Sequence, residues 1–301
     1  ESACEWQTGY IYIVTTSSSL ISGNGSVLIA FDPDDGGTEE VLQTGLILHD
    51  IAFSSRGEMF LSTNDMVYKV DPGTKDLTPY MSLPVLAGCE IEPDMGGVLL
   101  MAGNVNAWNI GCQPGSAVQL ADYTGLSYEN LGVDPVSRDF YVASSGSTVY
   151  NIFHNEYDGR GNVTGSTRYE MTTGVGYMRG MCVDMEGFLY VTIDSNGNSR
   201  SVGRFKPGLA NEPKWFDFCN YYAGNNPASG RWGDITVLGD HLFLIDTYND
   251  RLVILDATGT TEAERYITEY ESDVFSAPLS DSERYGIAAV PEWQICIGPG
   301  S

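Results

Sequence analysis

Aromatic and arginine side chains gather in four segments of the chain, each of which precedes a short apolar run. These segments read DYTGLSYEN, TTGVGYMRG, CNYYAGNNPASGRWG and YESDVFSAPLSDSERYG. Tyr, Trp and Arg are enriched at recognition surfaces because each combines a large contact area with a polar group. The same side chains suit stacking on sugars, whereas in a structural role they would pack between neighbouring sheets. We favour recognition and predict a protein- or carbohydrate-binding site composed of Tyr128, Tyr177, Arg179, Tyr221, Tyr222, Arg231, Trp232 and Tyr285.

A second group of residues offers oxygen atoms at the starts of apolar runs. Glu90, Asn130 and Asp234 stand at these positions, and hard cations such as calcium take several oxygen ligands. They are therefore the candidate metal ligands of the chain. Arg179 and Arg231 occupy the same level and would repel a cation, and acidic residues at strand starts also cap turns. The alternative of a purely structural role stays open.

Other signatures of catalysis are absent from the sequence. We find no Gly-x-Ser-x-Gly elbow, no P-loop and no dinucleotide fingerprint. The three histidines, His49, His154 and His241, are isolated, and no cysteines have CxxC spacing. A zinc cluster is therefore not expected. We assign no catalytic residue, and the sequence favours binding over an enzyme.

The elements that must position these residues are short strands. The segment Gly233–Gly259 reads GDITVLGDHLFLIDTYNDRLVILDATG, with three apolar runs separated by turn residues, as in antiparallel strands. The same order recurs at His49–Pro72, Gly132–Phe153 and Gly180–Pro207, and more weakly at Cys89–Cys112. A fourth strand follows each unit, as in LTPYM, AVQLA, TRYEM, KWFDF and ERYITEY.

Four-stranded units that recur every 40 to 53 residues or so predict a β-propeller. The first strands begin near Asp50, Glu90, Gly132, Gly180, Gly233 and Gly286. The last start lies close to the end of the sequence, and the N-terminal segments GYIYIVTT, SVLIAFDP and EEVLQ supply the remaining three strands. We therefore expect an all-β, six-bladed propeller of four-stranded antiparallel blades, whose last blade contains strands from both ends. A count of five or seven would follow if one unit, most plausibly the weak one at Cys89, were misassigned.

A single propeller domain would then occupy residues 1–301. The expected blades are 286–301 with 1–45, 46–84, 85–125, 126–173, 174–222 and 223–285. The C-terminal segment AAVPEWQICIG could instead supply two strands, which would leave either Tyr10–Thr15 or Gln294–Ile297 surplus. A surplus strand could add to the sheet of a neighbouring subunit. This alternative would make the protein a structural subunit of an extracellular filament or assembly.

The repeats resemble known propeller families. IDTYNDRLVILDATG and GMCVDMEGFLYVTIDSN are similar to NHL-type repeats, and DIAFSSRGEMFLSTNDMVYKVDP resembles the gluconolactonase (SMP-30) type of six-bladed propeller. The latter resemblance implies a divalent cation, usually calcium, held by Glu, Asn and Asp side chains and used to activate water. Under that alternative, Glu90, Asn130 and Asp234 would serve a calcium-dependent lactonase or ester hydrolase, although the surrounding motifs differ.

Net charge restricts the partners of the protein. The formal charge is −25, whereas nucleic-acid-binding proteins usually present a basic surface. The chain also contains no run of about eighteen apolar residues, the length expected of a membrane-spanning helix. We expect neither nucleic-acid binding nor membrane insertion.

Six cysteines and two sequons indicate an extracellular protein. Within the blade model we expect the disulfides Cys4–Cys296, Cys89–Cys112 and Cys182–Cys219, and disulfides persist in oxidising compartments. Asn24 and Asn162 begin the triplets Asn-Gly-Ser and Asn-Val-Thr, which are acceptors of N-linked glycans. The sequence therefore predicts a secreted, non-catalytic propeller that acts as a protein- or glycan-binding or scaffold module, with self-association through its termini as a further expectation.

Overall fold

The structure of the protein is a computed structural model. It describes residues 6–15, 25–54, 56–82, 89–94, 97–102, 106–109, 118–122, 127–145, 150–158, 162–171, 177–194, 200–207, 216–219, 232–246, 251–259, 266–271 and 286–290.

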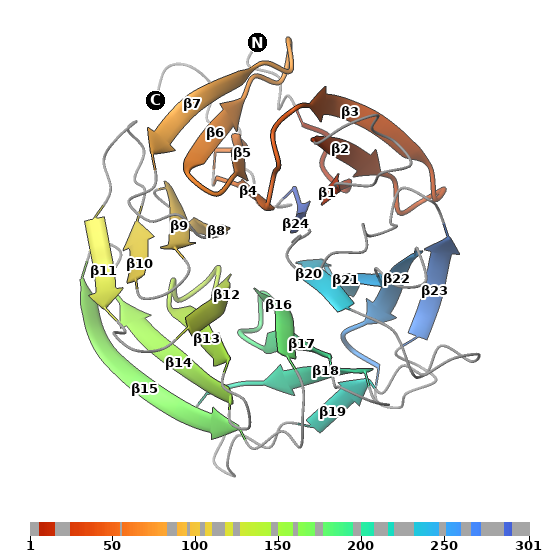
Figure 1. Ribbon diagram of the computed structural model, residues 1–301. Coiled ribbons are helices and arrows are strands. Elements are labelled where there is room, and N and C mark those ends of the chain that lie inside the picture. Colours follow the sequence, from red (N-terminus) through yellow and green to blue (C-terminus); the bar gives the residue numbers. More distant parts are fainter. Residues whose placement is uncertain are drawn as a thin grey trace, which may run out of the picture.

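In the described part of the chain, strands form six four-stranded sheets that follow one another around a central axis (Figure 1). We number these blades in chain order and give the strands of each from the axis outward. Blade 1 consists of β24 (Gly286–Ala289), β1 (Ile11–Thr15), β2 (Ser26–Phe31) and β3 (Thr38–Thr44). Blade 2 consists of β4 (Asp50–Phe53), β5 (Met59–Ser62), β6 (Met66–Val70) and β7 (Leu77–Ser82). Blade 3 consists of β8 (Cys89–Asp94), β9 (Gly97–Ala102), β10 (Asn106–Asn109) and β11 (Val118–Asp122).

The second half of the ring has the same order. Blade 4 consists of β12 (Ser127–Val133), β13 (Phe140–Ser145), β14 (Tyr150–Tyr157) and β15 (Val163–Met171). Blade 5 consists of β16 (Tyr177–Val183), β17 (Leu189–Asp194), β18 (Arg200–Phe205) and β19 (Phe216–Cys219). Blade 6 consists of β20 (Trp232–Leu238), β21 (His241–Asp246), β22 (Arg251–Asp256) and β23 (Tyr266–Glu271).

The predicted all-β propeller of four-stranded antiparallel blades is confirmed, and so is the pairing of the two ends of the sequence. Strand β1 lies between β2 and the C-terminal strand β24, with Ile13 opposite both Ile29 and Ile287. Residues Ile11–Thr15 are therefore an integral part of blade 1 and not a surplus strand. The other segment considered as surplus, Gln294–Ile297, lies outside the described residues.

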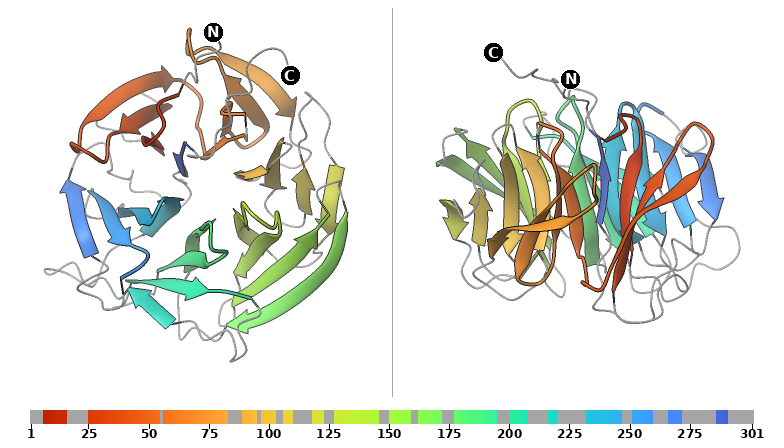
Figure 2. Two further views of the ribbon diagram at one scale, coloured as in Figure 1. Left: turned by 180° about the vertical axis from the view of Figure 1, so that it is seen from behind. Right: turned by 90° about the horizontal axis from the view of Figure 1, so that it is seen from above.

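Alternating strand directions give the ring two distinct faces (Figure 2). Connections between the first and second strands, and between the third and fourth, emerge on one face, which we call the turn face. Connections between the second and third strands, and from each fourth strand to the next blade, emerge on the other, which we call the loop face. Blades 2 to 6 thus contribute two connections to each face, whereas blade 1, whose first two strands β24 and β1 come from opposite ends of the sequence, contributes only one to the turn face.

Hydrophobic side chains on both sides of each blade form the core between neighbouring blades. Ile11, Ile13 and Ile287 of blade 1 pack with Phe243 and Ile245 of blade 6. On the other side of blade 1, Trp6 and Tyr12 contact Phe53 of blade 2, with ring centroids 6.4 and 5.3 Å from that of Phe53. Because a blade buries apolar residues on both faces, its strands read as nearly continuous apolar runs.

Aspartates fix the tight turns that lead from the first strand to the second. In blade 4, Asp134 Oδ1 accepts hydrogen bonds from the backbone N–H groups of Val136 and Ser137, at 2.8 and 3.1 Å. In blade 5, Asp184 Oδ1 accepts from the N–H groups of Glu186 and Phe188, both at 2.9 Å. These Asx turns explain why the motifs GVDPVSRDFYV and CVDMEGFLYV share an aspartate at this point.

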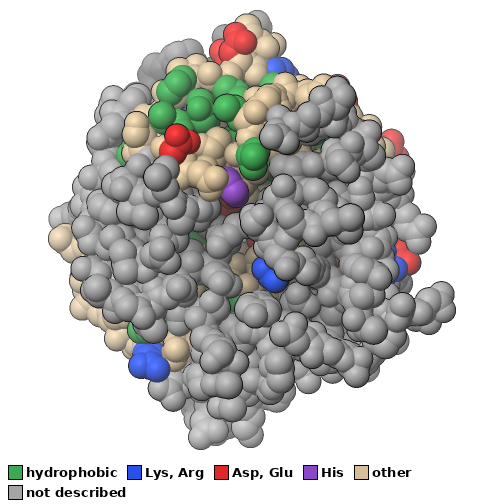
Figure 3. Space-filling view, in the orientation of Figure 1, with side chains coloured by type: hydrophobic (Ala, Val, Ile, Leu, Met, Phe, Trp, Pro, Cys, Tyr) green, Lys and Arg blue, Asp and Glu red, His purple; other side chains and the backbone are tan. Residues whose placement is uncertain are grey.

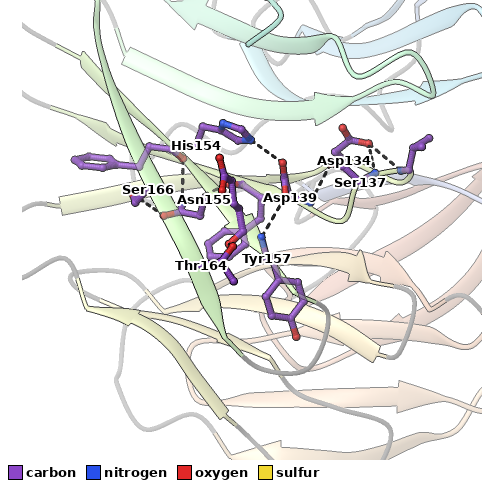
Figure 4. A network of polar contacts seen from close by, with 12 residues as sticks. Asp134, Ser137, Asp139, His154, Asn155, Tyr157, Thr164 and Ser166 are labelled. Carbon is purple, nitrogen blue, oxygen red and sulfur yellow. Dashed lines mark hydrogen bonds and ion pairs between the residues drawn. The ribbon is translucent and has the colours of Figure 1, made fainter. Parts of the chain in front are cut away.

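His154 belongs to a structural network beside the turn of blade 4 (Figure 4). Its Nε2 lies 2.9 Å from Asp139 Oδ2, and its ring stacks on that of Tyr141 at a centroid distance of 4.9 Å. Asp139 Oδ1 also accepts a hydrogen bond from the Tyr157 N–H. The histidine therefore joins two strands of one blade.

The part of the chain that the structure describes contains no helix with the length and hydrophobicity that a membrane crossing requires.

Candidate functional site

The loop face carries the predicted recognition residues. Figure 3 shows this face in space-filling form: one sector exposes hydrophobic side chains, and a histidine side chain borders the central hollow. In the described connection from blade 1 to blade 2, Ile47 is 41% exposed, whereas the following Leu48 and His49 are buried. An exposed apolar side chain thus stands beside the mouth of the ring on this face.

Three predicted aromatic residues lie at the loop-face ends of consecutive inner strands. Tyr128 is the second residue of β12, and Tyr177 and Trp232 are the first residues of β16 and β20. Each of these strands contains a β-bulge within its first few residues, at Tyr128/Asn130, Met178/Gly180 and Trp232/Ile235. Bulges of this kind occur next to functional sites, where they redirect the chain. The half-buried Arg179 lies within the bulge of β16.

The remaining predicted recognition residues, Tyr221, Tyr222, Arg231 and Tyr285, lie outside the described residues. The backbone positions of Tyr128, Tyr177 and Trp232 and the half-buried Arg179 therefore lie at one end of blades 4, 5 and 6, and the side chains of these three aromatic residues lie outside the described part.

Aspartates of the inner strands fasten neighbouring blades to each other. Asp50 Oδ1 accepts a hydrogen bond from the N–H of Ile51 in its own strand, and Oδ2 accepts one from the N–H of Ile91 in blade 3, both at 2.7 Å. Asp234 repeats the arrangement, because it accepts from the N–H groups of Ile235 at 2.8 Å and of Ile287 in blade 1 at 3.2 Å. Each carboxylate thus satisfies two backbone donors on adjacent blades.

Glycines make room for these aspartates on the preceding blade. A Cβ atom on Gly286 would lie 2.5 Å from Asp50 Cα and 2.6 Å from its Oδ1. A Cβ atom on Gly180 would lie 2.5 Å from Asp234 Oδ1 and 2.7 Å from Asp234 Cα. Since real Cβ atoms do not approach other heavy atoms so closely, only glycine fits at these two positions.

Two of the candidate metal ligands also form hydrogen bonds with neighbouring blades. Asn130 is 1% exposed and donates from Nδ2 to the carbonyl oxygen of Met178 in blade 5 at 3.0 Å. Asp234 is engaged as described above, and the side chain of Glu90 lies outside the described part. Among the described residues, no group of three or more His, Cys, Asp or Glu side chains could hold a metal ion. The contacts of Asp234 favour the structural alternative for that residue, whereas the Oδ1 atom of Asn130 is buried without a hydrogen-bond partner in the described part of the chain.

Two titratable groups lie on the inner strands, two residues beyond the positions where neighbouring blades are joined. Glu92 and Cys182 stand two residues after Glu90 and Gly180, on the same sides of β8 and β16. Burial raises the pKa of Glu92 well above its usual range, and the negative charges of Asp50 and Asp234 add to this effect. Burial likewise raises the pKa of the Cys182 thiol, with a further contribution from Glu92. The sequence did not single out Glu92 and assigned Cys182 to a disulfide, although the spacing of two residues from Glu90 and Gly180 is visible in the repeats.

The predicted disulfide Cys182–Cys219 is wrong. Cys182 is a free, buried cysteine that packs with Tyr190 and Ile235. It lies on β16, the innermost strand of blade 5, whereas Cys219 lies on β19, the outermost. Three strand spacings separate them by about 14 Å, and a disulfide needs Cα atoms within about 7 Å. The prediction placed both cysteines in one blade, but two residues of the same blade can lie on strands that are not neighbours.

The other predicted disulfides fall at least partly outside the described residues. Cys4, Cys112 and Cys296 belong to segments that are not described, and the same holds for the side chain of Cys89. The pairs Cys4–Cys296 and Cys89–Cys112 stay predictions.

Comparisons with known proteins support the fold without showing a family. No protein-family model matches the chain, and no curated protein matches it. Among solved structures, the chain is similar to a chain in a crystal structure of a nidogen/laminin complex, with 11% identity, a TM-score of 0.66, and coverage of 94% of this chain and 100% of that one. It is also similar to TolB from Acinetobacter baumannii, with 14% identity, a TM-score of 0.58, and coverage of 94% and 67%. At these identities the similarity establishes the β-propeller fold alone, and the predicted NHL or gluconolactonase family gains no support.

Proposed function

We propose that the protein is a non-catalytic binding module that holds a protein partner against its loop face. The observation that carries this proposal is the placement of Tyr128, Tyr177 and Trp232 at the bulged starts of three consecutive inner strands, beside Arg179. Large aromatic and arginine side chains near the centre of a surface supply most of the binding energy in protein interfaces. Ile47, which is exposed, lies on the same face in the connection from blade 1 to blade 2.

The polar residues of the ring support binding over catalysis. Asp50 and Asp234 direct both carboxylate oxygens at backbone N–H groups, one in their own strand and one in the neighbouring blade. A metal-dependent hydrolase needs such groups to be directed at a cation or a water molecule. The similarity to a chain of a nidogen/laminin complex agrees with a role in protein binding, because that propeller was solved together with a protein partner.

Extracellular localisation is part of the proposal. It rests on the exposed sequon at Asn162 and on the cysteines outside blade 5, and it makes extracellular proteins and glycans the first ligands to test. A carbohydrate ligand would use the same aromatic surface by stacking on sugar rings.

The test is a binding screen against purified extracellular proteins, laminin included, and against a glycan array, followed by affinity measurements on the strongest ligand. Trp232→Ala and Tyr128→Ala should each weaken binding by at least tenfold, the effect of a binding hot spot. Val136→Ala is the matched control, because Val136 is 62% exposed in a turn on the opposite face; its affinity should stay within twofold.

Three outcomes would contradict the proposal. The first is binding that Val136→Ala abolishes while Trp232→Ala and Tyr128→Ala leave it intact. The second is hydrolysis of lactones that is lost in a chelator, which would favour the gluconolactonase-type alternative. The third is a filament in the electron microscope whose assembly depends on residues 1–9 or 291–301, which would favour the structural subunit.

A further inference from the structure

Two sequons occur in the chain, and the structure distinguishes them by the surroundings of their hydroxyl residues. Ser26, the third residue of the Asn24 sequon, is fully buried, and its Oγ accepts a hydrogen bond from the Leu48 N–H at 2.9 Å. Its neighbour Gly25 is buried against the backbone of Thr44 and Gly45. Thr164, the third residue of the Asn162 sequon, is exposed.

Asn162 itself lies on the surface. It is exposed and directly precedes β15, at the loop end of the hairpin that β15 forms with β14. The hydroxyl of Thr164 donates to the carbonyl oxygen of Glu156 on the opposite strand at 3.3 Å. The whole triplet from Asn162 to Thr164 therefore follows the outer edge of blade 4.

Asp158 holds Asn162 in one conformation. The backbone N–H of Asn162 donates to Asp158 Oδ1 at 3.0 Å, and its Nδ2 donates to Asp158 Oδ2 at 2.7 Å. The Asp158 N–H in turn donates to the Asn162 carbonyl oxygen at 3.1 Å. The Asn162 amide nitrogen carries two hydrogens, so replacement of one by a sugar leaves the other available for the bond to Asp158.

We propose that Asn162 carries an N-linked glycan and that Asn24 does not. The donor is an oligosaccharide linked to a lipid through pyrophosphate. A bond forms between Asn162 Nδ2 and the anomeric carbon of the first sugar, the bond from that carbon to the phosphate oxygen breaks, the amide loses one proton, and the lipid pyrophosphate leaves. No oxidant or reductant is required.

The position of Asn162 also decides which face the glycan occupies. The β14–β15 connection joins a third strand to a fourth strand and therefore belongs to the turn face, as does the β12–β13 turn with its exposed Val136. A glycan at Asn162 would stand at the rim of the turn face and leave the loop face free.

The test is expression of the full chain in a secretory eukaryotic host, with electrophoresis and intact-mass measurement before and after treatment with an N-glycosidase. The wild type and Asn24→Gln should show one glycosidase-sensitive shift of equal size. Asn162→Gln and Thr164→Ala should lose that shift, whereas Thr164→Ser, which keeps the hydroxyl, should retain it. Circular dichroism of each secreted variant establishes that loss of the shift does not reflect misfolding.

Three results would overturn the proposal: no shift in folded, secreted wild-type protein, a shift that Asn24→Gln removes, or two shifts that are lost one at a time in the two asparagine variants.

Discussion

At the scale of single residues, the ring depends on carboxylates that serve two blades at once. Asp50 was predicted to begin the first strand of a blade, and Asp234 was a candidate ligand for calcium. The structure instead directs their oxygens at backbone N–H groups. Buried N–H groups must be paired, and this requirement explains an aspartate at the start of an inner strand without a metal. A sequence alone shows the aspartate but not the donor in the next blade, some forty or fifty residues away.

Asp50→Ala should lower the free energy of unfolding by about 2–6 kcal/mol, because two buried N–H groups, those of Ile51 and Ile91, would lose their acceptor at about 1–3 kcal/mol each. Chemical denaturation measures the loss. Asp71→Ala is the matched control: Asp71 also accepts from two N–H groups, those of Gly73 and Thr74, but in an exposed turn where water replaces it. A control loss as large as that of Asp50→Ala would contradict the role assigned to Asp50.

Glu92 gives a pH-dependent prediction. Its pKa is raised in the folded state, whereas in the unfolded chain it is near 4.3. Below pH about 4 both states carry the proton, so the raised pKa has no effect on stability. As the pH rises, the unfolded state releases its proton first, and folding loses stability until the pH passes the folded-state pKa. Glu92→Gln removes this loss.

The variant should therefore gain stability over the wild type as the pH is raised from 4 to 8, in denaturation curves recorded at each pH. A stability difference between Glu92→Gln and the wild type that does not change with pH would show that Glu92 ionises normally in the folded protein.

At the scale of elements, apolar runs and turn residues located the strands well, and their ends less well. The first strands of blades 4 and 5 were expected to begin at Gly132 and Gly180, but β12 and β16 begin at Ser127 and Tyr177. The residues left out of the predicted strands lie at the bulges, where polar residues interrupt the apolar pattern of the sequence. A bulge breaks the alternation on which strand prediction relies, so the most informative part of the candidate site was the part least visible in the sequence.

The closing strand β24 provides the prediction at this scale. Gly286→Ala should destabilise the protein by more than about 2 kcal/mol, because the new Cβ would overlap Asp50. The Asp50 carboxylate is held by hydrogen bonds from two backbone N–H groups, and β24 is held by its pairing with β1, so neither can move away freely. The midpoint of thermal or chemical unfolding measures this effect. Gly45→Ala is the control, since a Cβ there has no heavy atom within 4 Å; it should be neutral or stabilising by up to about 1 kcal/mol. Equal effects of the two substitutions would contradict the packing of β24 against blade 2.

At the scale of the whole molecule, the two ends of the sequence complete one blade, and the neighbouring blades hold that blade from both sides. Strand β24 pairs with β1. On the side of blade 6, the Ile287 N–H donates to Asp234 Oδ2 and the Ala289 N–H donates to Thr236 Oγ1. On the other side, Gly286 packs against Asp50 of blade 2. The repeat period predicted this closure, because a unit that begins near the C-terminus needs strands from elsewhere. The period could not predict the disulfides, since it fixes the blade of each cysteine but not its distance from a partner.

Amide hydrogen exchange of β24 and β1 tests the closed ring most directly. The account predicts that the amides of Ile287 and Ala289, together with those of Ile11–Val14, exchange only through global unfolding. Their exchange free energies should then match the free energy of unfolding from denaturant. Exchange of Ile287 and Ala289 at the rate of an unstructured peptide, in protein whose β20–β22 amides are fully protected, would contradict it.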